Sequence, residues 1–321
     1  VAETAICGLV PEVIKEFEAN HGILPNSEFA ILGLGKIGGR ELLPGSDLDV
    51  IFLYEPGDAK ESNGPKPLGP TVYYIRLCQR ISTAITAQSG EGRLYELDAR
   101  LRPDGNAGAL ATQFQTLRDY YIIETETGKS KAWTWEHMAL TRARPIYYTD
   151  GFNLKISTEL SNILCQSRED DKLLEDILTM RARIASQYPD NQTWNIKYLS
   201  GGMVDIEFLA QYLQLRYANQ HPDILSTNSR KALLNAAKLK LIDQDDAIKL
   251  TDTLDFWRTI QGILRLTGAT NLNDESVIEA RGELILRTTG APDLETLQSQ
   301  MLQMAHSCEE IIQKYIPKSL N

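Results

Sequence analysis

The first third of the chain alternates short apolar runs with polar breaks that contain glycine or proline. Ser27–Leu34 and Asp47–Tyr54 are rich in β-forming residues and each is bounded by such a break, so we expect two buried strands. A helix is expected before them, over Pro11–Asn20. The polar stretch Gly57–Pro70, rich in proline and glycine, predicts a mobile loop.

The stretch from Arg93 to Arg102 alternates strictly between apolar and polar side chains. This period of two predicts a strand with one face in the core and the other over a polar site. The polar face would carry Glu96, Asp98, Arg100 and Arg102. An amphipathic helix is expected before this strand, with its apolar stripe formed by Val72, Ile75, Cys78, Ile81 and Ile85.

Beyond about residue 113 the apolar positions recur with the period of a helix. The expected helical segments lie near 113–124, 151–165, 171–187, 203–218, 229–240, 245–266, 275–287 and 293–315. The expected fold class is therefore α+β, with a mixed domain of strands and helices over residues 1–149 followed by an all-α helical bundle over 150–321. The break is placed near Thr149–Gly151.

Composition narrows the classes of protein to consider. The 321 residues are 42% apolar, enough for real cores, and carry a net charge of −10 with a pI near 5.1. This acidic balance argues against a nucleic-acid partner, because phosphate backbones are bound by clustered Lys and Arg. The four cysteines are widely spaced, which indicates neither a zinc site nor a disulfide framework. Because no long apolar run and no leader is present, we expect a cytoplasmic protein with no membrane partner.

Two aspartates open the second predicted strand. Asp47 and Asp49 are two residues apart, so they project from one face while Leu48 and Val50 point into the core. Like charges this close repel unless cations neutralise them, and hard carboxylate oxygens suit Mg²⁺ or Mn²⁺. Asp98, on the polar face of the alternating segment, is the candidate third ligand and a candidate general base.

A glycine-rich stretch, Gly33–Gly39, precedes the aspartates and allows two interpretations. In the first, its backbone amides and the side chains of Lys36 and Ser46 bind a triphosphate, with the small residues allowing close approach. In the second, it is a dinucleotide-binding turn with Glu55 as the ribose acid. The second is disfavoured because the residues after the glycines are too few for a crossover helix.

Four ordered sequence blocks together resemble bacterial glutamine synthetase adenylyltransferases. They are GLGKIGGRELLPGSDLDVIFLY (33–54), LDARLRPDGNAG (97–108), AWTWEHMALTRAR (132–144) and GGMVDIEFLAQY (201–212). The resemblance implies a polymerase-β-like nucleotidyltransferase domain followed by a helical domain. It also implies that Asp47 and Asp49 bind metal, and that Gly35, Lys36 and Ser46 belong to the nucleotide loop.

The same resemblance implies a reaction and its partners. Family members carry two such halves: one transfers AMP from ATP to a tyrosine of glutamine synthetase, and the other removes it by phosphorolysis. The Trp133-Thr-Trp135-Glu-His and Gly202-Met-Val-Asp205 forms resemble the adenylylating half. A PII-type signalling protein is a further candidate partner. The alternatives left open are AMP removal and a regulatory binding module without catalysis.

Several other residues in these blocks have simpler interpretations. Arg100 and Arg102 could contact phosphate or pair with the acids. One of Trp133 and Trp135 is expected in the core. The remaining expectations are an internal ion-pair network for Glu136 and Arg142–Arg144, a structural role for His137, and helix capping by Asp205 and Glu207.

Overall fold

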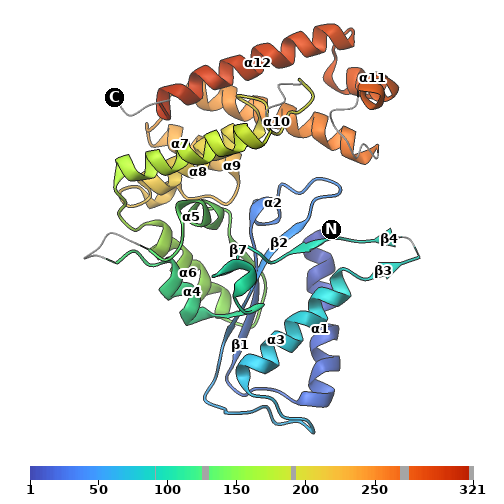
Figure 1. Cartoon of the computed structure of the whole chain (residues 1–321), viewed down its shortest axis with the longest axis vertical. Coiled ribbons are helices and arrows are strands. Elements are labelled where there is room, and N and C mark those ends of the chain that lie inside the picture. Colours follow the sequence, from blue (N-terminus) through green and yellow to red (C-terminus); the bar gives the residue numbers. More distant parts are fainter. Residues whose placement is uncertain (91, 125–129, 189–192, 268–274, 318–321) are drawn as a thin grey trace. The chain divides into compact units, whose positions relative to one another are not determined.

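The computed structural model describes residues 1–90, 92–124, 130–188, 193–267 and 275–317. Contacts divide the chain into two compact units (Figure 1). The first comprises Val1–Leu42 and Ser46–Gln166, and the second comprises Leu43–Gly45 and Ser167–Asn321. Strands occur in the first unit, whereas the described part of the second has only helices as regular elements. The α+β class is therefore confirmed.

The first unit is built on a mixed sheet whose order is β5-β2-β1-β7. Strand β1 pairs antiparallel with β2, from Glu28 opposite Glu55 to Gly33 opposite Val50, and antiparallel with β7 on its other edge. The other edge of β2 pairs in parallel with β5 near its start and with β6 further along. The strand bounds are β1 Glu28–Gly33, β2 Leu48–Glu55, β5 Leu97–Asp98, β6 Ala111–Gln113 and β7 Arg144–Tyr148, with a separate ribbon of β3 Gln88–Ser89 and β4 Gly92–Arg93.

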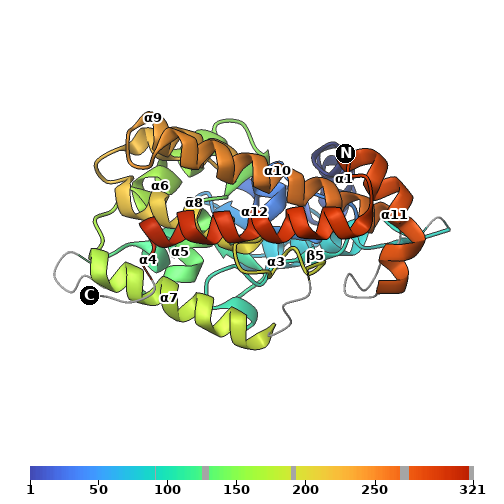
Figure 2. The ribbon, with the colours of Figure 1, turned by 90° about the horizontal axis from the view of Figure 1, so that it is seen from above.

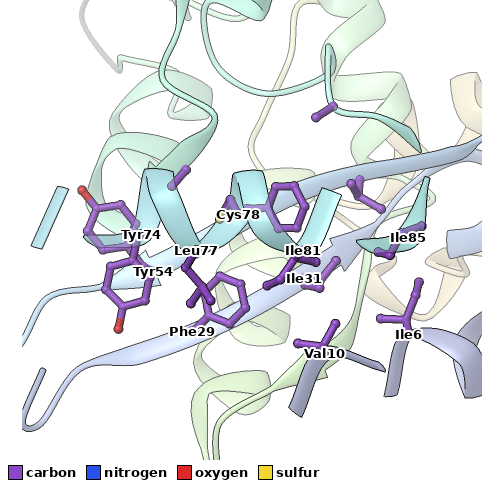
Figure 3. Close-up of a cluster of buried hydrophobic side chains, with 14 of the residues drawn as sticks. Ile6, Val10, Phe29, Ile31, Tyr54, Tyr74, Leu77, Cys78, Ile81 and Ile85 are labelled. Atoms are coloured by element: carbon purple, nitrogen blue, oxygen red, sulfur yellow. The ribbon is translucent and has the colours of Figure 1, made fainter. Parts of the chain in front are cut away.

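Helices cover both faces of this sheet. On one face α1 and α3 form a core with alternate residues of β1 and β2; Figure 3 shows Phe29 and Ile31 of β1 beside Leu77 and Ile81 of α3. On the other face α4 and α6 pack against β2, β1 and β7. The helices of this unit are α1 Ala2–His21, α2 Gly35–Gly38, α3 Pro70–Ile85, α4 Phe114–Tyr121, α5 Thr134–Leu140 and α6 Phe152–Leu164, with a 3-10 turn at Gly105–Ala107.

The second unit packs its helices around a core centred on α10 (Figure 2). Helix α10 contacts α8, α9, α11 and α12, and its Trp257 is fully buried. The helix bounds are α7 Asp170–Gln187, α8 Met203–Tyr217, α9 Ser229–Lys238, α10 Gln244–Leu266, α11 Glu275–Thr289 and α12 Leu294–Tyr315, with a 3-10 turn at Pro222–Ile224. No helix in the described ranges is both long and apolar enough to cross a membrane; the cytoplasmic location stays a prediction.

The predicted periodic segments correspond closely to these elements. Strands β1 and β2 and helices α6 to α12 agree with the predictions to within a few residues. Helix α1, however, begins at Ala2 rather than Pro11, and the buried stripe of α3 includes Tyr73, Tyr74 and Leu77 while Val72 is exposed. Strand β7 was not predicted.

The strand predicted over Arg93–Arg102 was wrong in extent. Only Gly92–Arg93 and Leu97–Asp98 are strand. The Asp98 carboxylate accepts the backbone N–H of Arg100 at 2.9 Å, a local turn that ends pairing with β2. The prediction that Arg102 lies on an exposed polar face was also wrong, because this side chain turns inward and is 9% exposed.

The predicted domain boundary differs from the structure, whereas the rejection of the dinucleotide interpretation is confirmed. The units divide between Gln166 and Ser167 rather than near Thr149–Gly151, because α6 packs on the sheet. The Gly57–Pro70 loop is hydrogen-bonded to the end of α1, as in the bond from Lys66 N–H to Asn20 O. The antiparallel pairing of β1 and β2 excludes the dinucleotide fold, which needs parallel strands there.

A buried ion pair joins the turn after α2 to the chain before β7. Arg142 donates from Nη2 to Oε2 of Glu41, and these side chains are 5% and 3% exposed. The Glu41 backbone N–H also donates to Lys36 O at 2.8 Å. The pair therefore fixes the residues that follow the glycine turn.

Replacing Glu41 with Gln should destabilise the first unit by about 3 kcal/mol, because the buried Arg142 charge would lose its counter-charge. Chemical unfolding monitored by circular dichroism measures this. The control is Glu16→Gln, which breaks an exposed pair with Arg80 and should cost less than about 1 kcal/mol. Equal costs for the two variants would contradict a stabilising role for the buried pair.

Two glycines of the second unit provide a matched test of its packing. Gly201 and Gly290 share a φ of +74°, but a Cβ on Gly201 would lie 1.9 Å from Ala305 O, whereas one on Gly290 meets nothing within 4 Å. Gly290→Ala should therefore cost only the left-handed strain, about 1 kcal/mol. Gly201→Ala should cost at least about 2 kcal/mol more, since α12 must move. Thermal unfolding of both variants checks this difference, and similar losses would refute the close approach.

Candidate active site

Two of the three candidate acids lie side by side on neighbouring strands. Asp49 of β2 is in register with Asp98 of β5, and Leu48 N–H donates to Glu96 O at 2.9 Å beside them. Paired residues of parallel strands project from the same face, so both carboxylates face the same side of the sheet. Asp47 is exposed and lies just before β2. The fold thus brings the acids to one edge.

The glycine turn packs against this edge. Leu34 N–H donates to Asp49 O at 2.9 Å. Gly35 has φ +49°, and a Cβ there would lie 2.3 Å from Oδ2 of Asp49, so any larger residue would collide with the carboxylate. Lys36 follows in α2 and is partly buried, and Ser46 is 8% exposed at the approach to β2. Helix α2, which contains Gly35 and Lys36, contacts β2, and Ser46 lies two residues before β2 begins.

The Arg100 side chain is hydrogen-bonded to the Asp98 carboxylate. Its Nε donates to both carboxylate oxygens at 2.9 Å. These side-chain hydrogen bonds lower the pKa of Asp98. The pKa of Arg100 is raised in turn, first by hydrogen bonding to Asp98 and then also by the charges of Asp47 and Asp49. One guanidinium therefore lies in the field of all three acids.

The acids are not gathered into a closed metal cage. Within the described ranges, no group of three His, Cys, Asp or Glu side chains lies close enough together to hold an ion. Mg²⁺ nevertheless needs only one or two protein carboxylates, with water and phosphate completing its shell. Asp49 and Asp98, in register on neighbouring strands, supply that number of carboxylates.

Arg102 is placed differently from the other candidate site residues. Its guanidinium donates to Ala99 O at 2.6 Å and to Gly108 O at 3.1 and 3.2 Å. These bonds close the loop that follows Asp98. The contacts therefore support a positioning role for Arg102, and direct nucleotide binding by it stays a prediction.

Helix α5 carries the aromatic block. Trp133 and Trp135 are 70% and 41% exposed, so the expectation that one lies in the core was wrong. Glu136 is buried and accepts hydrogen bonds from the Tyr120 hydroxyl and the Trp133 N–H, and burial raises its pKa. His137 is buried against the backbone carbonyls of Tyr121 and Trp133, consistent with a structural role.

The arginines that follow α5 pair elsewhere. Arg144 donates to Glu3 and to the carbonyls of Ile37 and Gly38, and Arg142 pairs with Glu41. Glu136 is therefore not the centre of the expected ion-pair network, which instead braces α2. These partners lie far apart in the sequence, so no local motif indicated the pairs.

The acids of the GGMVDIEF block contact groups within the second unit. Asp205, in the first turn of α8, accepts Gly201 N–H at 2.9 Å and pairs with Arg181 at 2.9 Å. Glu207 lies 3.8 Å from Arg258. These contacts agree with a structural, helix-starting role.

Two cavities lie away from the acidic edge. One, of about 450 Å³, is lined by Glu28 and Glu55 at the opposite end of β1 and β2, where Lys155 bonds to both carboxylates. The other, of about 420 Å³, lies between α10 and α12. The candidate site belongs to neither, so its assignment depends on the acids and the glycine turn rather than on a pocket.

Comparison with known families gives two matches that divide the chain near the boundary of the units. A family model described as glutamate-ammonia ligase adenylyltransferase matches residues 1–160, and one described as GlnD PII-uridylyltransferase matches residues 171–314. The structural units change between Gln166 and Ser167.

Individual relatives match nearly the whole chain. The bifunctional glutamine synthetase adenylyltransferase/adenylyl-removing enzyme of Xanthobacter autotrophicus is 36% identical over 318 residues, 98% of this chain and 31% of the relative. The enzyme of the same name from Brucella suis is 37% identical over 311 residues, 94% of this chain and 30% of the relative. The chain thus spans about a third of the length of these relatives, and it belongs to the glutamate-ammonia ligase adenylyltransferase family.

Proposed function

We propose that this chain is a metal-dependent adenylyltransferase that transfers AMP from ATP to a tyrosine of glutamine synthetase and releases pyrophosphate. In this proposal the first unit is a polymerase-β-like nucleotidyltransferase domain and the second is its helical domain. The tyrosine hydroxyl attacks the α-phosphorus of ATP in line with the departing pyrophosphate.

The observation that carries the proposal is the pairing of Asp49 with Asp98 beside the glycine turn. A turn of small residues next to paired carboxylates suits a nucleotide triphosphate with its cation. The names of the relatives indicate the reaction that we propose for this site, the adenylylation of glutamine synthetase.

Asp47, Asp49 and Asp98 would hold one or two Mg²⁺ or Mn²⁺ ions, which supply charge stabilisation for the attacking and leaving oxygens when bound. The chain itself orients the nucleotide through the backbone at Gly35 and the side chains of Lys36 and Ser46. Asp98 is better suited to be a ligand than a general base, because its lowered pKa weakens its attraction for a proton.

The direction of the reaction is part of the proposal. The tryptophan pair of α5 and the GGMVDIEF block resemble the adenylylating half of the family, and we assign this chain to that half. A PII-type signalling protein is proposed as a partner of the second unit, which is the part matched by the PII-uridylyltransferase model.

A labelling experiment tests the direction. The chain is incubated with glutamine synthetase, Mg²⁺ and α-labelled ATP, and we expect label on the synthetase together with released pyrophosphate. In a parallel reaction, adenylylated synthetase and phosphate should give no ADP. ADP without label transfer would instead identify the removing activity. Binding of the synthetase without either product would identify a regulatory module.

Asp49→Asn should abolish AMP transfer almost entirely, because the amide keeps the shape of the side chain but loses a charged ligand. ATP with Mg²⁺ should raise the melting temperature of the parent but not of this variant. The control is Asp58→Asn, an exposed aspartate beyond the other end of β2, which should behave like the parent. Unchanged transfer by the Asp49 variant would remove it from the site. Asp47→Asn should show the same loss of AMP transfer as Asp49→Asn.

Asp98→Asn separates a ligand from a simple ion-pair partner. If Asp98 binds metal, AMP transfer should fall by about two orders of magnitude or more while the melting temperature changes little. Glu96→Gln, which breaks the neighbouring pair with Arg93, is the control and should leave transfer near the parent value. A modest loss of stability with full activity per folded Asp98 variant would make Asp98 only a partner of Arg100.

A further inference from the structure

Arg100 contacts Asp98, one acid of the candidate site, through both its backbone and its side chain. Its backbone N–H and its Nε both donate to Asp98 at 2.9 Å, and the guanidinium reaches both carboxylate oxygens. The Arg100 side chain is 71% exposed, whereas that of Asp98 is 18% exposed. The arginine thus covers the carboxylate from the solvent side.

The other two acids act on the same guanidinium. The charges of Asp47 and Asp49 add to that of Asp98 in raising the pKa of Arg100. Three carboxylates at one edge would repel one another without a nearby cation. In this structure Arg100 supplies positive charge where the proposed reaction requires metal.

We propose that Arg100 is a built-in counter-ion that competes with the divalent cation for Asp98. This inference rests on the proposed function, because it concerns the same metal site. In this proposal a metal ion that binds Asp98 displaces the guanidinium, which then remains tethered beside the nucleotide site. Metal affinity is consequently lower than the three acids alone would give, and Arg100 is a positioning residue that keeps the edge neutralised between turnovers.

The test is metal binding without nucleotide. Mn²⁺ is titrated into the full chain, and free Mn²⁺ is followed by electron paramagnetic resonance. Arg100→Gln should bind Mn²⁺ roughly twofold to fivefold more tightly than the parent, the scale of losing one exposed ion pair. Arg100→Lys should fall between them, because it keeps the charge but lacks the planar fork.

Arg93→Gln is the matched control, because Arg93 lies on the same stretch of chain but pairs with Glu96. It should bind Mn²⁺ like the parent. Equal or weaker binding by Arg100→Gln, tighter binding by Arg100→Lys than by Arg100→Gln, or an equal gain in Arg93→Gln would overturn the inference.

Asp49→Asn distinguishes failure of this inference from failure of the proposed function. If the parent has no Mn²⁺ site that this variant loses, the counter-ion inference is overturned, and the transfer assay with ATP and Mg²⁺ decides the proposed function separately. If the site exists but Arg100→Gln leaves its affinity unchanged, only the counter-ion role fails. Melting temperatures of all variants confirm that each titration reports on folded protein.

Discussion

The hydrogen bonding of β2 along both of its edges is the constraint on which the first unit depends. Strand β1 takes one edge, and β5 followed by β6 takes the other. Helices cover both faces, so Leu48, Val50, Ile51, Phe52 and Leu53 are all buried. A strand enclosed in this way can present charged groups only at its ends. Asp47 and Asp49 therefore lie at or just before the start of β2, because the residues that follow them in the strand are buried in the core.

That placement requires close support from the neighbouring turn. The glycine turn lies against Asp49 and is held from behind by the buried Glu41–Arg142 pair and by the contacts of Arg144 with Ile37 and Gly38. Arg102 closes the loop after Asp98 in a similar way. The candidate site therefore lies at an open edge of the sheet. Its residues are positioned by buried ion pairs and hydrogen bonds of the neighbouring turn and loop.

The local sequence pattern predicted an element correctly where the whole element has one regular pattern of buried positions. The apolar runs of β1 and β2 and the helical periods of α6 to α12 predicted those elements because each buries one constant face or is fully enclosed. The segment from residue 93 to 102 has an equally regular pattern, yet only Arg93, Leu97 and Asp98 within it are strand. There the Asp98 side chain captures a backbone amide, and the buried Arg102 satisfies carbonyls instead of facing solvent.

The remaining differences depend on partners distant in sequence. The brace between Glu41 and Arg142 joins residues that no local motif connects, and β7 contains Pro145, which argues against a strand interior on sequence grounds. Asp98 could be proposed as a neighbour of Asp49 from alternation, but its register with Asp49 and its capture by Arg100 emerge only from the folded sheet.

The distribution of tryptophans gives the molecule an intrinsic optical asymmetry. Trp133 and Trp135, in the first unit, are 70% and 41% exposed, whereas Trp194 and Trp257, in the second, are 5% and 0% exposed. Indoles already in water change their emission wavelength little when the chain unfolds, while buried indoles shift to longer wavelength. Because proteins of two units need not unfold in one step, the emission maximum will follow the helical unit, and circular dichroism will follow both.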